Sequence, residues 1–394
     1  MKFDFRDSRY VRMFEDSIEG RRTIQYILND PELLRSNYTF WKTFFPADLA
    51  TIPAPMSGFA AVRAEAKMPE HATMADWRAP LGNSRLGEEG QAVGYNAGII
   101  DLITLGWQEQ AKEREYREKI FQDFGSDAPL LLGYATDVLQ PRVDSINMAL
   151  SNMAAQALST GEVVYKGGMG IKGPVYKAPV PAENFTNFSK AISDPSIDLL
   201  AEMAALEEEY KENKWGLPNM ATEWCVPYDM FMNVFLKNQA VIDYIKTGWL
   251  ASNGQLISQI SSVPNSIVTA DAFNKFVVGS YPGLSPIRVI EEKQFDNGVQ
   301  VNGWKSGTLV LKPTGNAGKT YRTEILDRIL KEKYGNSLIS KVWGTTADGV
   351  ITVSNTTGVN GEYKYWATDV YASATPVLET YLNIVIVDGT QAKQ

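Results

Sequence analysis

Two residues of this sequence have the side chains of a nucleophile and a general base, and each type occurs only once: Cys225 and His71. A thiol that attacks a substrate needs an imidazole within hydrogen-bond distance. His71 lies in a proline-rich stretch far in sequence from Cys225, and no local pattern connects the two. We therefore expect no catalytic dyad. A single cysteine and a single histidine also exclude an intrachain disulfide and a zinc site built from these residues.

The chain also carries an incomplete phosphate-binding loop. Gly315-Asn-Ala-Gly-Lys-Thr320 ends in the order that the Walker A motif requires, but the motif needs a glycine five residues before Gly318, and that position is Pro313. Lys312 and Lys319 are more simply predicted to flank a solvated turn. We expect no nucleotide cofactor and no cofactor of another kind.

Carboxylates occur in runs rather than in separated pairs, as in Glu88-Glu89 and Glu207-Glu208-Glu209. Side chains of adjacent residues diverge, whereas the two carboxylates of a glycosidase must flank one bond. We interpret these runs as charged faces. The sequence therefore predicts that the protein is not an enzyme. A carbohydrate-active enzyme that uses the many Trp and Tyr residues is the weaker alternative.

Composition and charge limit the number of domains and the classes of protein to which the chain can belong. The 394 residues allow two or three domains, and the 44% hydrophobic content supplies a substantial core. Lys and Arg number 38 and Asp and Glu number 46, so the formal net charge of -8 argues against a protein that grips nucleic acid. No signal peptide opens the chain, and no apolar run reaches the roughly 20 residues that span a bilayer, so we expect synthesis in a cytoplasm.

The chain is organised around a long helix that runs into a strand, within residues 126–166. Apolar residues recur with three-and-four spacing from Val143 to Leu158, which predicts a spine helix over residues 141–160 that ends at Gly161. Pro141 fits its first turn, or a kink after an earlier helical segment. The other face carries small neutral polar residues, so we expect it to meet another segment of the chain or another subunit. These residues are Ser145, Asn147, Ser151, Asn152, Gln156 and Ser159.

Two stretches before the spine lack the apolar residues for a core of their own. Residues 1–47 form an aromatic-rich arm with one helix around residues 11–28, and residues 56–67 and 88–100 are predicted to pair as the arms of an extended hairpin. An arm and a hairpin of this kind need a partner surface on a neighbouring molecule. We therefore predict intersubunit contacts at the hairpin and on the polar helix face, through Trp77, Arg78, Arg85, Glu88, Asn147 and Gln156.

The rest of the chain mixes helices and strands, so the predicted fold class is α+β. Further helices are predicted over residues 105–124, 198–211, 227–238, 240–246 and 270–278. Strands are predicted over residues 162–165, 222–226, 287–291 and 308–311, with a hairpin over 341–366 that turns at Asp348-Gly349 and Asn360-Gly361, and a long closing strand over 377–387.

This order of arm, proline-rich hairpin, charged helix, spine helix, strand and α+β domain with a returning strand resembles the major capsid protein of tailed bacteriophages. The likeness covers nearly the whole chain and is strongest to the lambda-type branch of the Hong Kong 97-like capsid fold, although no short signature decides it. Five stretches carry it: Leu49-Ala-Thr-Ile-Pro-Ala-Pro-Met56, Trp77-Arg-Ala-Pro-Leu-Gly82, Ala149 to Leu158 running into Gly161-Glu-Val-Val164, Trp224-Cys-Val-Pro-Tyr-Asp-Met-Phe231, and Ser373 to Ile386.

The resemblance implies five regions along the chain. They are an N-terminal arm at residues 1–47, an E-loop hairpin at 48–100, a P-domain at 101–225 that includes the spine helix, an A-domain at 226–370, and a closing P-domain strand with the C-terminus at 371–394.

The resemblance also implies a function. The chain is expected to assemble into hexamers and pentamers of an icosahedral or prolate phage head that encloses double-stranded DNA without binding it specifically. Its location would be the virion, after assembly in the host cytoplasm. Too few residues precede the hairpin to hold a scaffold segment, so a separate scaffolding protein is expected, with a portal protein and decoration proteins as further partners. An encapsulin-like shell that encloses enzymes has the same fold and is the alternative.

Overall fold

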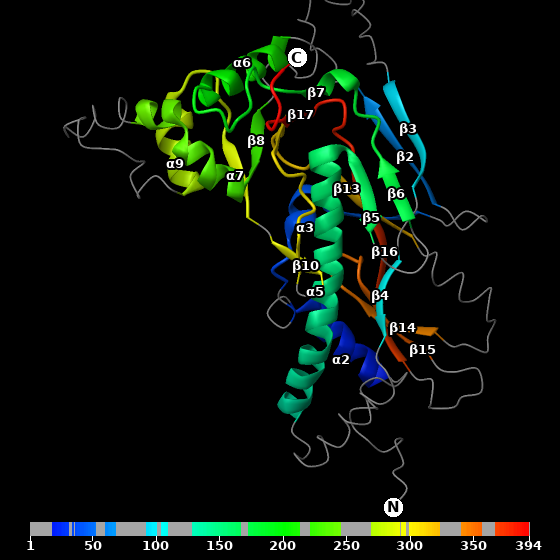
Figure 1. Cartoon of the computed structure of the whole chain (residues 1–394). Helices are drawn as coiled ribbons and strands as arrows, with labels where there is room; N and C mark the ends of the chain where they lie inside the picture. The colour runs from blue at the N-terminus through cyan, green and yellow to red at the C-terminus, as the bar shows by residue number, and fades with distance from the viewer. Residues whose placement is uncertain are drawn as a thin grey trace, which may run out of the picture.

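The computed structural model describes residues 18–30, 34, 36–52, 60–67, 92–100, 104–108, 128–166, 172–212, 221–245, 269–291, 293–296, 299–323, 340–356 and 367–393. Within these residues the chain forms two large β-sheets, one long helix beside them and a group of shorter helices (Figure 1). Helices and strands are mixed along the chain, so the predicted α+β class is confirmed.

Helix α5 (Ala128–Thr160) runs through the middle of the molecule and is 33 residues long (Figure 1). It begins before the predicted residue 141 and continues through Pro141, whose ring lies on the exposed side of the helix. A proline inside a helix removes one hydrogen bond, and the remaining bonds hold the turn. The helix ends at Gly161 as predicted, because this residue takes a left-handed φ of 70° and its N donates to Ala157 O at 2.9 Å.

One face of α5 is buried along the predicted three-and-four spacing. Its buried apolar side chains include Leu139, Val143, Ile146, Leu150, Met153, Ala154, Ala157 and Leu158. This face packs against strand β16 (Ala367–Leu378) and against the short helix α3 (Phe40–Phe44). The spine helix predicted from the sequence is therefore confirmed, with a longer N-terminal part.

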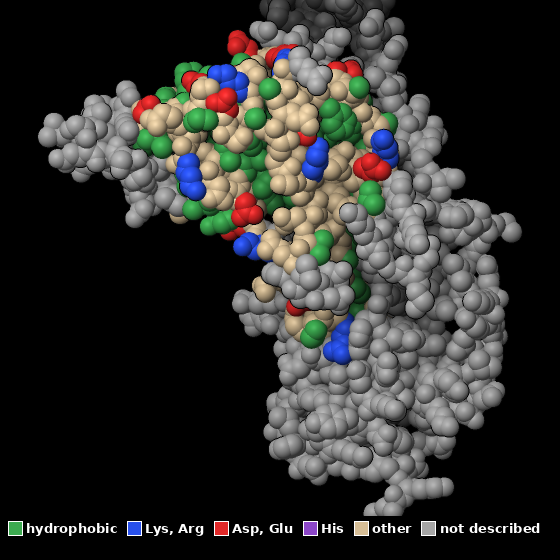
Figure 2. Space-filling model, viewed as in Figure 1, with side chains coloured by type: hydrophobic (Ala, Val, Ile, Leu, Met, Phe, Trp, Pro, Cys, Tyr) green, Lys and Arg blue, Asp and Glu red, His purple; other side chains and the backbone are tan. Residues whose placement is uncertain are grey.

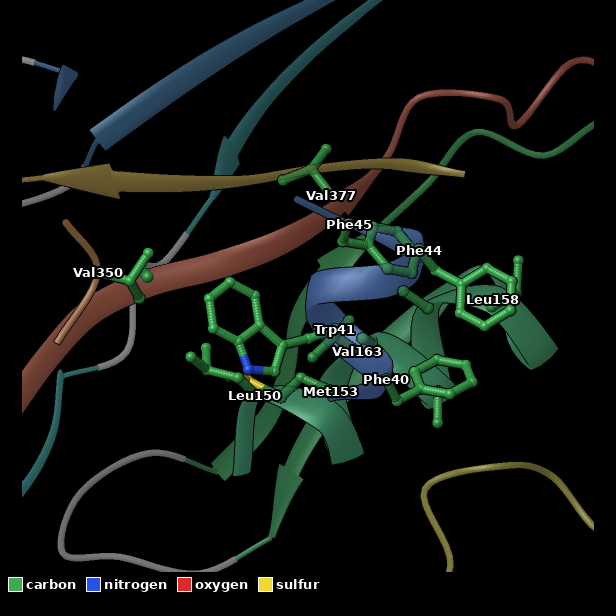
Figure 3. Close-up of a cluster of buried hydrophobic side chains, with 14 of the residues drawn as sticks. Phe40, Trp41, Phe44, Phe45, Leu150, Met153, Leu158, Val163, Val350 and Val377 are labelled. Carbon is green, nitrogen blue, oxygen red and sulfur yellow. The ribbon is translucent and has the colours of Figure 1, made fainter. Parts of the chain in front are cut away.

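Helix α3 and the residue after it insert aromatic side chains between α5 and the sheet. All four aromatic residues are at most 6% exposed: Phe40, Trp41, Phe44 and Phe45. Figure 3 shows them gathered with side chains of α5 and of the strand region: Leu150, Met153, Leu158, Val350 and Val377. Such large buried rings contribute much of the apolar area of a core. The N-terminal segment is therefore part of the main core and not a loose arm from residue 40 on.

The larger sheet has the strand order β1-β13-β16-β15-β14, and β4 also pairs with β16. Its remaining strands are β1 (Ala47–Ile52), β4 (Thr104–Gln108), β13 (Gly318–Thr323), β14 (Ser340–Thr345) and β15 (Thr352–Thr356). Strands β14 and β15 confirm the first part of the hairpin predicted over residues 341–366, and Gly349 makes its turn at a φ of 67°. The second predicted turn, Asn360-Gly361, lies outside the described residues.

The helix predicted over residues 105–124 is wrong for its first residues. Leu105 and Trp107 belong to β4, where Trp107 lies opposite Val370 of β16. Their spacing fits the alternation of a strand as well as a helix, and pairing with the long strand β16 decides between the two. Residues 109–124 lie outside the described part of the chain.

The second sheet has the order β7-β17-β12-β8-β9 and is buried on both faces. Its strands are β7 (Phe185–Thr186), β8 (Thr222–Pro227), β9 (Ile287–Ile290), β12 (Thr308–Pro313) and β17 (Val385–Asp388). Leu309 and Leu311 pack in a core with helices α6 (Leu199–Glu212), α7 (Tyr228–Asn233) and α9 (Ala270–Phe276). Val310 between them packs in the core of α3 and α5. Successive residues of a strand point to opposite faces, so β12 needs a continuous apolar run.

Shorter elements complete the described chain. Helix α2 (Ile18–Asn29) packs beside β14 and confirms the predicted N-terminal helix from residue 18 on. Strand β5 (Glu162–Lys166) is confirmed and pairs with β6 (Lys172–Lys177), which the sequence did not predict. The 3-10 turns are Ala182–Asn184, Phe235–Lys237 and Val278–Ser280, and residues 239–245 are helical.

A two-stranded antiparallel ribbon runs through both large sheets. Strand β12 pairs with β17, and β13, the next strand after β12, pairs with β16, the strand before β17. The ribbon crosses between the sheets at residues 314–317 and 379–384. There Ala317 O accepts hydrogen bonds from Glu379 N at 3.1 Å and Thr380 N at 3.0 Å. The two sheets are therefore joined by two adjacent chain segments that also bond to each other.

The single closing strand predicted over residues 377–387 is wrong. The chain leaves the larger sheet after Leu378, makes a turn in which Asn383 N donates to Thr380 O at 2.8 Å, and joins the other sheet at Val385. The apolar pattern continues through the turn because residues on both sides of it are buried, so the sequence does not show the change of sheet.

The two sheets divide the chain differently from the predicted domain ranges, which themselves stay a prediction. Residues 318–323 and 340–356 fall in the range predicted for the A-domain, yet they pair into the sheet that lies on α5. Residues 385–388 fall in the predicted closing P-domain strand, yet they join the other sheet. Sheet membership depends on pairing over long sequence distances, which local patterns do not contain.

The predicted extended hairpin is confirmed in its two strands. β2 (Ala60–Lys67) and β3 (Ala92–Ile100) pair in antiparallel register from Ala60 opposite Ile100 to Lys67 opposite Ala92, and they form a two-stranded sheet of their own. Figure 1 shows the hairpin beside β6, at the edge of the molecule. Residues 68–91, which join the strands, lie outside the described part.

A segment of the same chain crosses the polar face of α5. It consists of β10 (Gln294–Asp296), β11 (Val299–Val301) and residues 302–305, and we call it the crossing segment. Asn152 Nδ2 donates to Gln294 Oε1 at 2.7 Å, and Lys305 N donates to Ser159 Oγ at 3.0 Å. Between these bonds Gly303 rests on the helix backbone, because a Cβ at this position would lie 2.4 Å from Asn152 O.

We expect Gly303→Ala to lower the free energy of unfolding by about 2 to 3 kcal/mol, because the added methyl group meets backbone atoms that cannot move aside. Gly315→Ala is the matched control: it strains a residue with a φ of 104°, but its Cβ meets open space, so we expect a loss of about 1 kcal/mol. Urea denaturation of the unassembled subunit measures both. Equal losses in the two variants would contradict the close approach at Gly303.

Candidate functional site

The predicted contact residues fall into two groups in the structure. Trp77, Arg78, Arg85 and Glu88 lie outside the described residues, so their contacts stay a prediction. Asn147 and Gln156 lie on the polar face of α5. Their surroundings show what this face does within one chain.

Asn147 holds helix α3 to α5. Its side chain is 1% exposed, and its Oδ1 accepts a hydrogen bond from Trp41 Nε1 at 3.0 Å. A buried indole N–H and a buried amide each need a partner, since leaving one unpaired costs about 1–3 kcal/mol. Asn147 therefore has a role inside the chain where the sequence analysis expected a contact with another subunit.

Gln156 joins the end of α5 to the strand that follows. Its Oε1 accepts a hydrogen bond from Val164 N of β5 at 2.7 Å, and its Nε2 donates to Asn152 Oδ1 at 2.8 Å. Asn152 and Ser159 bond to the crossing segment. Of the two expectations for the polar face, a segment of the same chain is the one that the structure shows over these residues. Ser145, nearer the start of the face, is exposed.

A buried ion pair lies where α3 meets the second sheet. Lys312 is fully buried, and its Nζ lies 2.5 Å from Glu223 Oε1 on the neighbouring strand, directly opposite in register. The same Nζ donates to Pro313 O at 2.9 Å and to Gly315 O at 2.6 Å. A buried ammonium needs this many partners, because its desolvation costs several kcal/mol. The prediction of a solvated turn is therefore wrong for Lys312, while Lys319 is exposed and lies 3.5 Å from Asp48.

The ion pair also holds the aromatic N-terminal segment. Lys312 Nζ lies 5.2 Å from the centre of the Phe44 ring, and the Arg288 guanidinium lies 4.5 Å from it. Arg288 is in addition 3.8 Å from Glu223. Cations within about 6 Å of a ring centre are attracted to its face. The docking of α3 is therefore coupled to the charges that close the second sheet.

Cys225 is unsuited to nucleophilic chemistry. It is fully buried in β8, and burial raises the pKa of its thiol to about 12, with the Glu223 carboxylate raising it and the Lys312 ammonium lowering it. A thiol of this kind stays protonated at neutral pH, whereas catalysis needs the thiolate. His71, the one histidine of the sequence, lies outside the described residues.

Glu207 is buried, which corrects its interpretation as part of a charged face. Its Oε1 accepts hydrogen bonds from Trp224 Nε1 at 2.6 Å and from Ser285 N at 2.7 Å, and its Oε2 accepts one from Ser285 Oγ at 2.5 Å. Glu208 and Glu209 are exposed as predicted. Glu207 therefore ties α6 to β8 and to the loop before β9, and every bond it makes is structural.

The described residues offer no site for a metal ion. None of their His, Cys, Asp and Glu side chains form a group of three or more that could hold one. Within the same residues, no helix combines the length and the apolar character that crossing a bilayer requires.

A second charged contact fixes α3 to the β14–β15 turn. Lys42 Nζ lies 2.8 Å from Asp348 Oδ2, and Asp348 Oδ1 accepts bonds from Thr346 Oγ1 at 2.5 Å and Val350 N at 3.1 Å. Partial burial alone would raise the pKa of Asp348, but the Lys42 charge and these hydrogen bonds outweigh it and hold the pKa below its ordinary value. The ionised form therefore stabilises the fold.

Comparison with known proteins gives likenesses among solved structures. No protein-family model matches the chain, and no curated protein does. The chain is similar to a phage-related protein from Bordetella bronchiseptica, with 13% identity, a TM-score of 0.48, and 92% of this chain and 98% of that chain covered. It is also similar to a proposed capsid protein of an Escherichia coli prophage, with 13% identity, a TM-score of 0.47, and 90% and 93% covered.

A third likeness is to a virus-like particle from Pyrococcus furiosus, with 9% identity, a TM-score of 0.40, and 95% of this chain and 100% of that chain covered. Phage-related proteins are thus among the solved structures to which the chain is similar. The lambda-type branch of the capsid fold stays a prediction.

We expect Lys312→Met to destabilise the subunit by about 3 kcal/mol, because the buried charge of Glu223 then keeps only Arg288, at 3.8 Å, as a cationic partner. Adding Glu223→Gln should recover about half of this loss, since the charge is removed but Pro313 O and Gly315 O still lack their donor. A double-mutant cycle by denaturation of the soluble subunit measures the coupling. If the losses of stability in the two single variants add up to the loss in the double variant, Lys312 and Glu223 do not interact.

Acid should weaken the contact between Lys42 and Asp348. Because the folded pKa of Asp348 is depressed, its contribution is present above the ordinary pKa of about 4 and is lost as the pH falls through the folded value. We expect the wild type to exceed Asp348→Asn in stability by up to about 1 kcal/mol at neutral pH, and this difference to shrink in acid. Unfolding measured from neutral pH down to about pH 3 tests this. Lys42→Met should flatten the dependence, and an unchanged pH profile in that variant would refute the assignment.

Proposed function

We propose that the chain is the major capsid protein of a tailed bacteriophage. It assembles into hexamers and pentamers of an icosahedral or prolate head that encloses double-stranded DNA. The observation that carries the proposal is the β2–β3 hairpin, which pairs as a two-stranded sheet of its own beside the folded core. The sequence resemblance supports the same assignment independently.

The hairpin needs a surface beyond its own two strands. Strands of eight and nine residues extend about 27 to 30 Å at the usual rise. A two-stranded hairpin is marginal in water, and three or more strands or a packed partner are needed for stability. A neighbouring subunit supplies that surface in the proposed shell, and the hairpin tip with Trp77, Arg78, Arg85 and Glu88 reaches it.

The internal use of the polar helix face agrees with this arrangement. Asn147 and Gln156 bond within the chain, so contacts between subunits fall on the hairpin and on exposed side chains elsewhere. Large apolar side chains that are exposed among the described residues are candidates for these contacts: Tyr26, Phe185, Tyr228 and Val301.

The net charge of the chain supports a shell that encloses DNA without binding it specifically. The formal net charge is -8 per chain, and Figure 2 shows Lys and Arg interspersed with Asp and Glu over the described part of one face. Each cation that contacts phosphate releases counterions and tightens non-specific binding. An acidic chain with mixed surface charge lets packaged DNA move along the shell wall.

Partners follow from the same proposal. A separate scaffolding protein, a portal protein and decoration proteins act with the chain during assembly in the host cytoplasm, and the assembled chain resides in the virion. The encapsulin-like shell is the alternative. A virus-like particle is among the similar structures. The content of the particle separates the two, since one encloses DNA and the other enzymes.

We expect the purified full-length chain to form closed shells visible by electron microscopy, with no hydrolytic activity. Deletion of Glu70 to Glu88 leaves residues 68, 69 and 89–91 as a short loop between β2 and β3, which a hairpin accommodates. We predict that this variant folds with an unchanged melting temperature but forms no shells, because its contact with the next subunit is gone. Normal shells from the deletion variant would refute the role of the hairpin. Hydrolysis abolished by changing His71 or Cys225 would refute the structural function itself.

A further inference from the structure

Five described strands of the two large sheets have only one neighbour in their sheet: β1, β4 and β14 in one, and β7 and β9 in the other. An outer strand carries backbone N–H and C=O groups that have no partner within the sheet, and these groups pair readily with a strand of another molecule. A chain that associates with its own copies through particular surfaces must prevent such pairing elsewhere.

At β9 one side chain occupies the outward groups of Ile287. Trp224 N of β8 donates to Pro286 O at 2.9 Å, so Ile287, the next residue, turns its own N–H and C=O away from β8. There Asn274 of α9 accepts the N–H on Oδ1 at 2.8 Å and donates Nδ2 to the C=O at 2.7 Å. The carboxamide has one acceptor and one donor group, like a peptide, and therefore takes the place of a neighbouring strand.

Strand β14 has the same arrangement at its last residue, Thr345. Thr346 N donates inward to Ile351 O at 2.9 Å, so Thr345 points outward. Gln25 of α2 accepts Thr345 N–H on Oε1 at 3.2 Å and donates Nε2 to Thr345 O at 2.8 Å. A Cβ at Gly344 would lie 2.8 Å from Gln25 Oε1, so glycine is needed there for the helix to approach.

Packing fixes both carboxamides in place. Asn274 follows Phe273, which is fully buried with its ring edge-on to Phe231 at 5.3 Å. Gln25 precedes Ile27 and Leu28, which are buried in the main core. A side chain on a rigid helix holds its position without losing further conformational entropy.

Two further outer strands, β7 and β1, are poor templates for a different reason. β7 has only two residues, and the pairing of β1 with β13 is irregular between Ala47 and Thr51. Short and irregular outer strands are known ways of preventing edge-to-edge pairing. β1, β7, β9 and β14 thus each have a feature that limits pairing with another chain, and β4 is only five residues long.

We propose that Asn274 and Gln25 are edge guards, which keep β9 and β14 from pairing with strands of a second copy and so direct association to other surfaces. Two residues on different helices make the same two-bond contact to outward groups of different sheets. The inference goes beyond the proposed shell and does not require it, because unguarded edges cause irregular association in any concentrated protein.

The test compares Asn274→Leu with Asn274→Asp in the full-length chain. Leucine removes both bonds and leaves the edge uncharged. Aspartate still accepts the Ile287 N–H, and its charge repels an incoming strand. We expect irregular, β-rich aggregates from the leucine variant only, seen by light scattering, infrared absorption and electron microscopy. We also expect the Ile287 amide to exchange about tenfold faster in the leucine variant, the factor for one lost hydrogen bond. Gln25→Leu and Gln25→Glu should repeat the contrast at Thr345.

Val226→Ala is the matched control, since Val226 is fully buried in β8, which lies between β12 and β9, and the substitution weakens the core without removing a bond to an outer strand. All variants are compared at denaturant concentrations that give the same folded fraction. Aggregation of Val226→Ala or of Asn274→Asp as fast as Asn274→Leu would overturn the proposal, because instability alone would then explain it. Electron microscopy separates irregular aggregates from closed shells, so failure of the wild type to form shells bears only on the proposed function.

Discussion

The burial of the aromatic segment Phe40–Phe45 between α5 and the sheets is the constraint on which the rest of the structure depends. On one side Trp41 bonds to Asn147 of the long helix, and on the other Phe44 lies under the charges of Lys312 and Arg288. The segment therefore contacts the helix, the larger sheet through β1 and β13, and the ion pair of the second sheet. Elements that are far apart in sequence are held in one arrangement because they share this core.

Three groups of buried polar side chains bond to partners in the same chain. The crossing segment bonds to Asn152 and Ser159 on the polar face of α5, Glu207 accepts bonds from four donors, and Lys312 is paired with a carboxylate and two carbonyl oxygens. Buried polar groups with all their bonds made favour one packing arrangement over others. The β2–β3 hairpin forms a two-stranded sheet of its own, as β5–β6 and β10–β11 do, and it is the one that the proposed function assigns to contacts between subunits.

Local patterns predicted the elements whose formation is local. The spine helix, its end at Gly161 and the two strands of the hairpin follow from periodicity and from glycine, and all are confirmed. Features set by pairing over long distances were missed: Lys312 is buried because Glu223 stands opposite it, and the closing strand is divided because its halves join different sheets. For the candidate site, the polar composition of the helix face predicted a packed face but left open whether its partner is the same chain or another subunit, because the segment that crosses it has weak strand signals.

The ribbon that runs through both sheets gives the molecule a direction in which it resists mechanical load. Tension between the two sheets acts along β12 and β13 on one side and along β16 and β17 on the other, so two covalent backbones carry it side by side. The hydrogen bonds that join the ribbon to neighbouring strands such as β8 and β15 lie across such a pull and must shear together. A force that peels β9 from β8 breaks bonds one at a time instead. The chain is therefore stiff along the line that joins its sheets, and it yields under load at its outer strands.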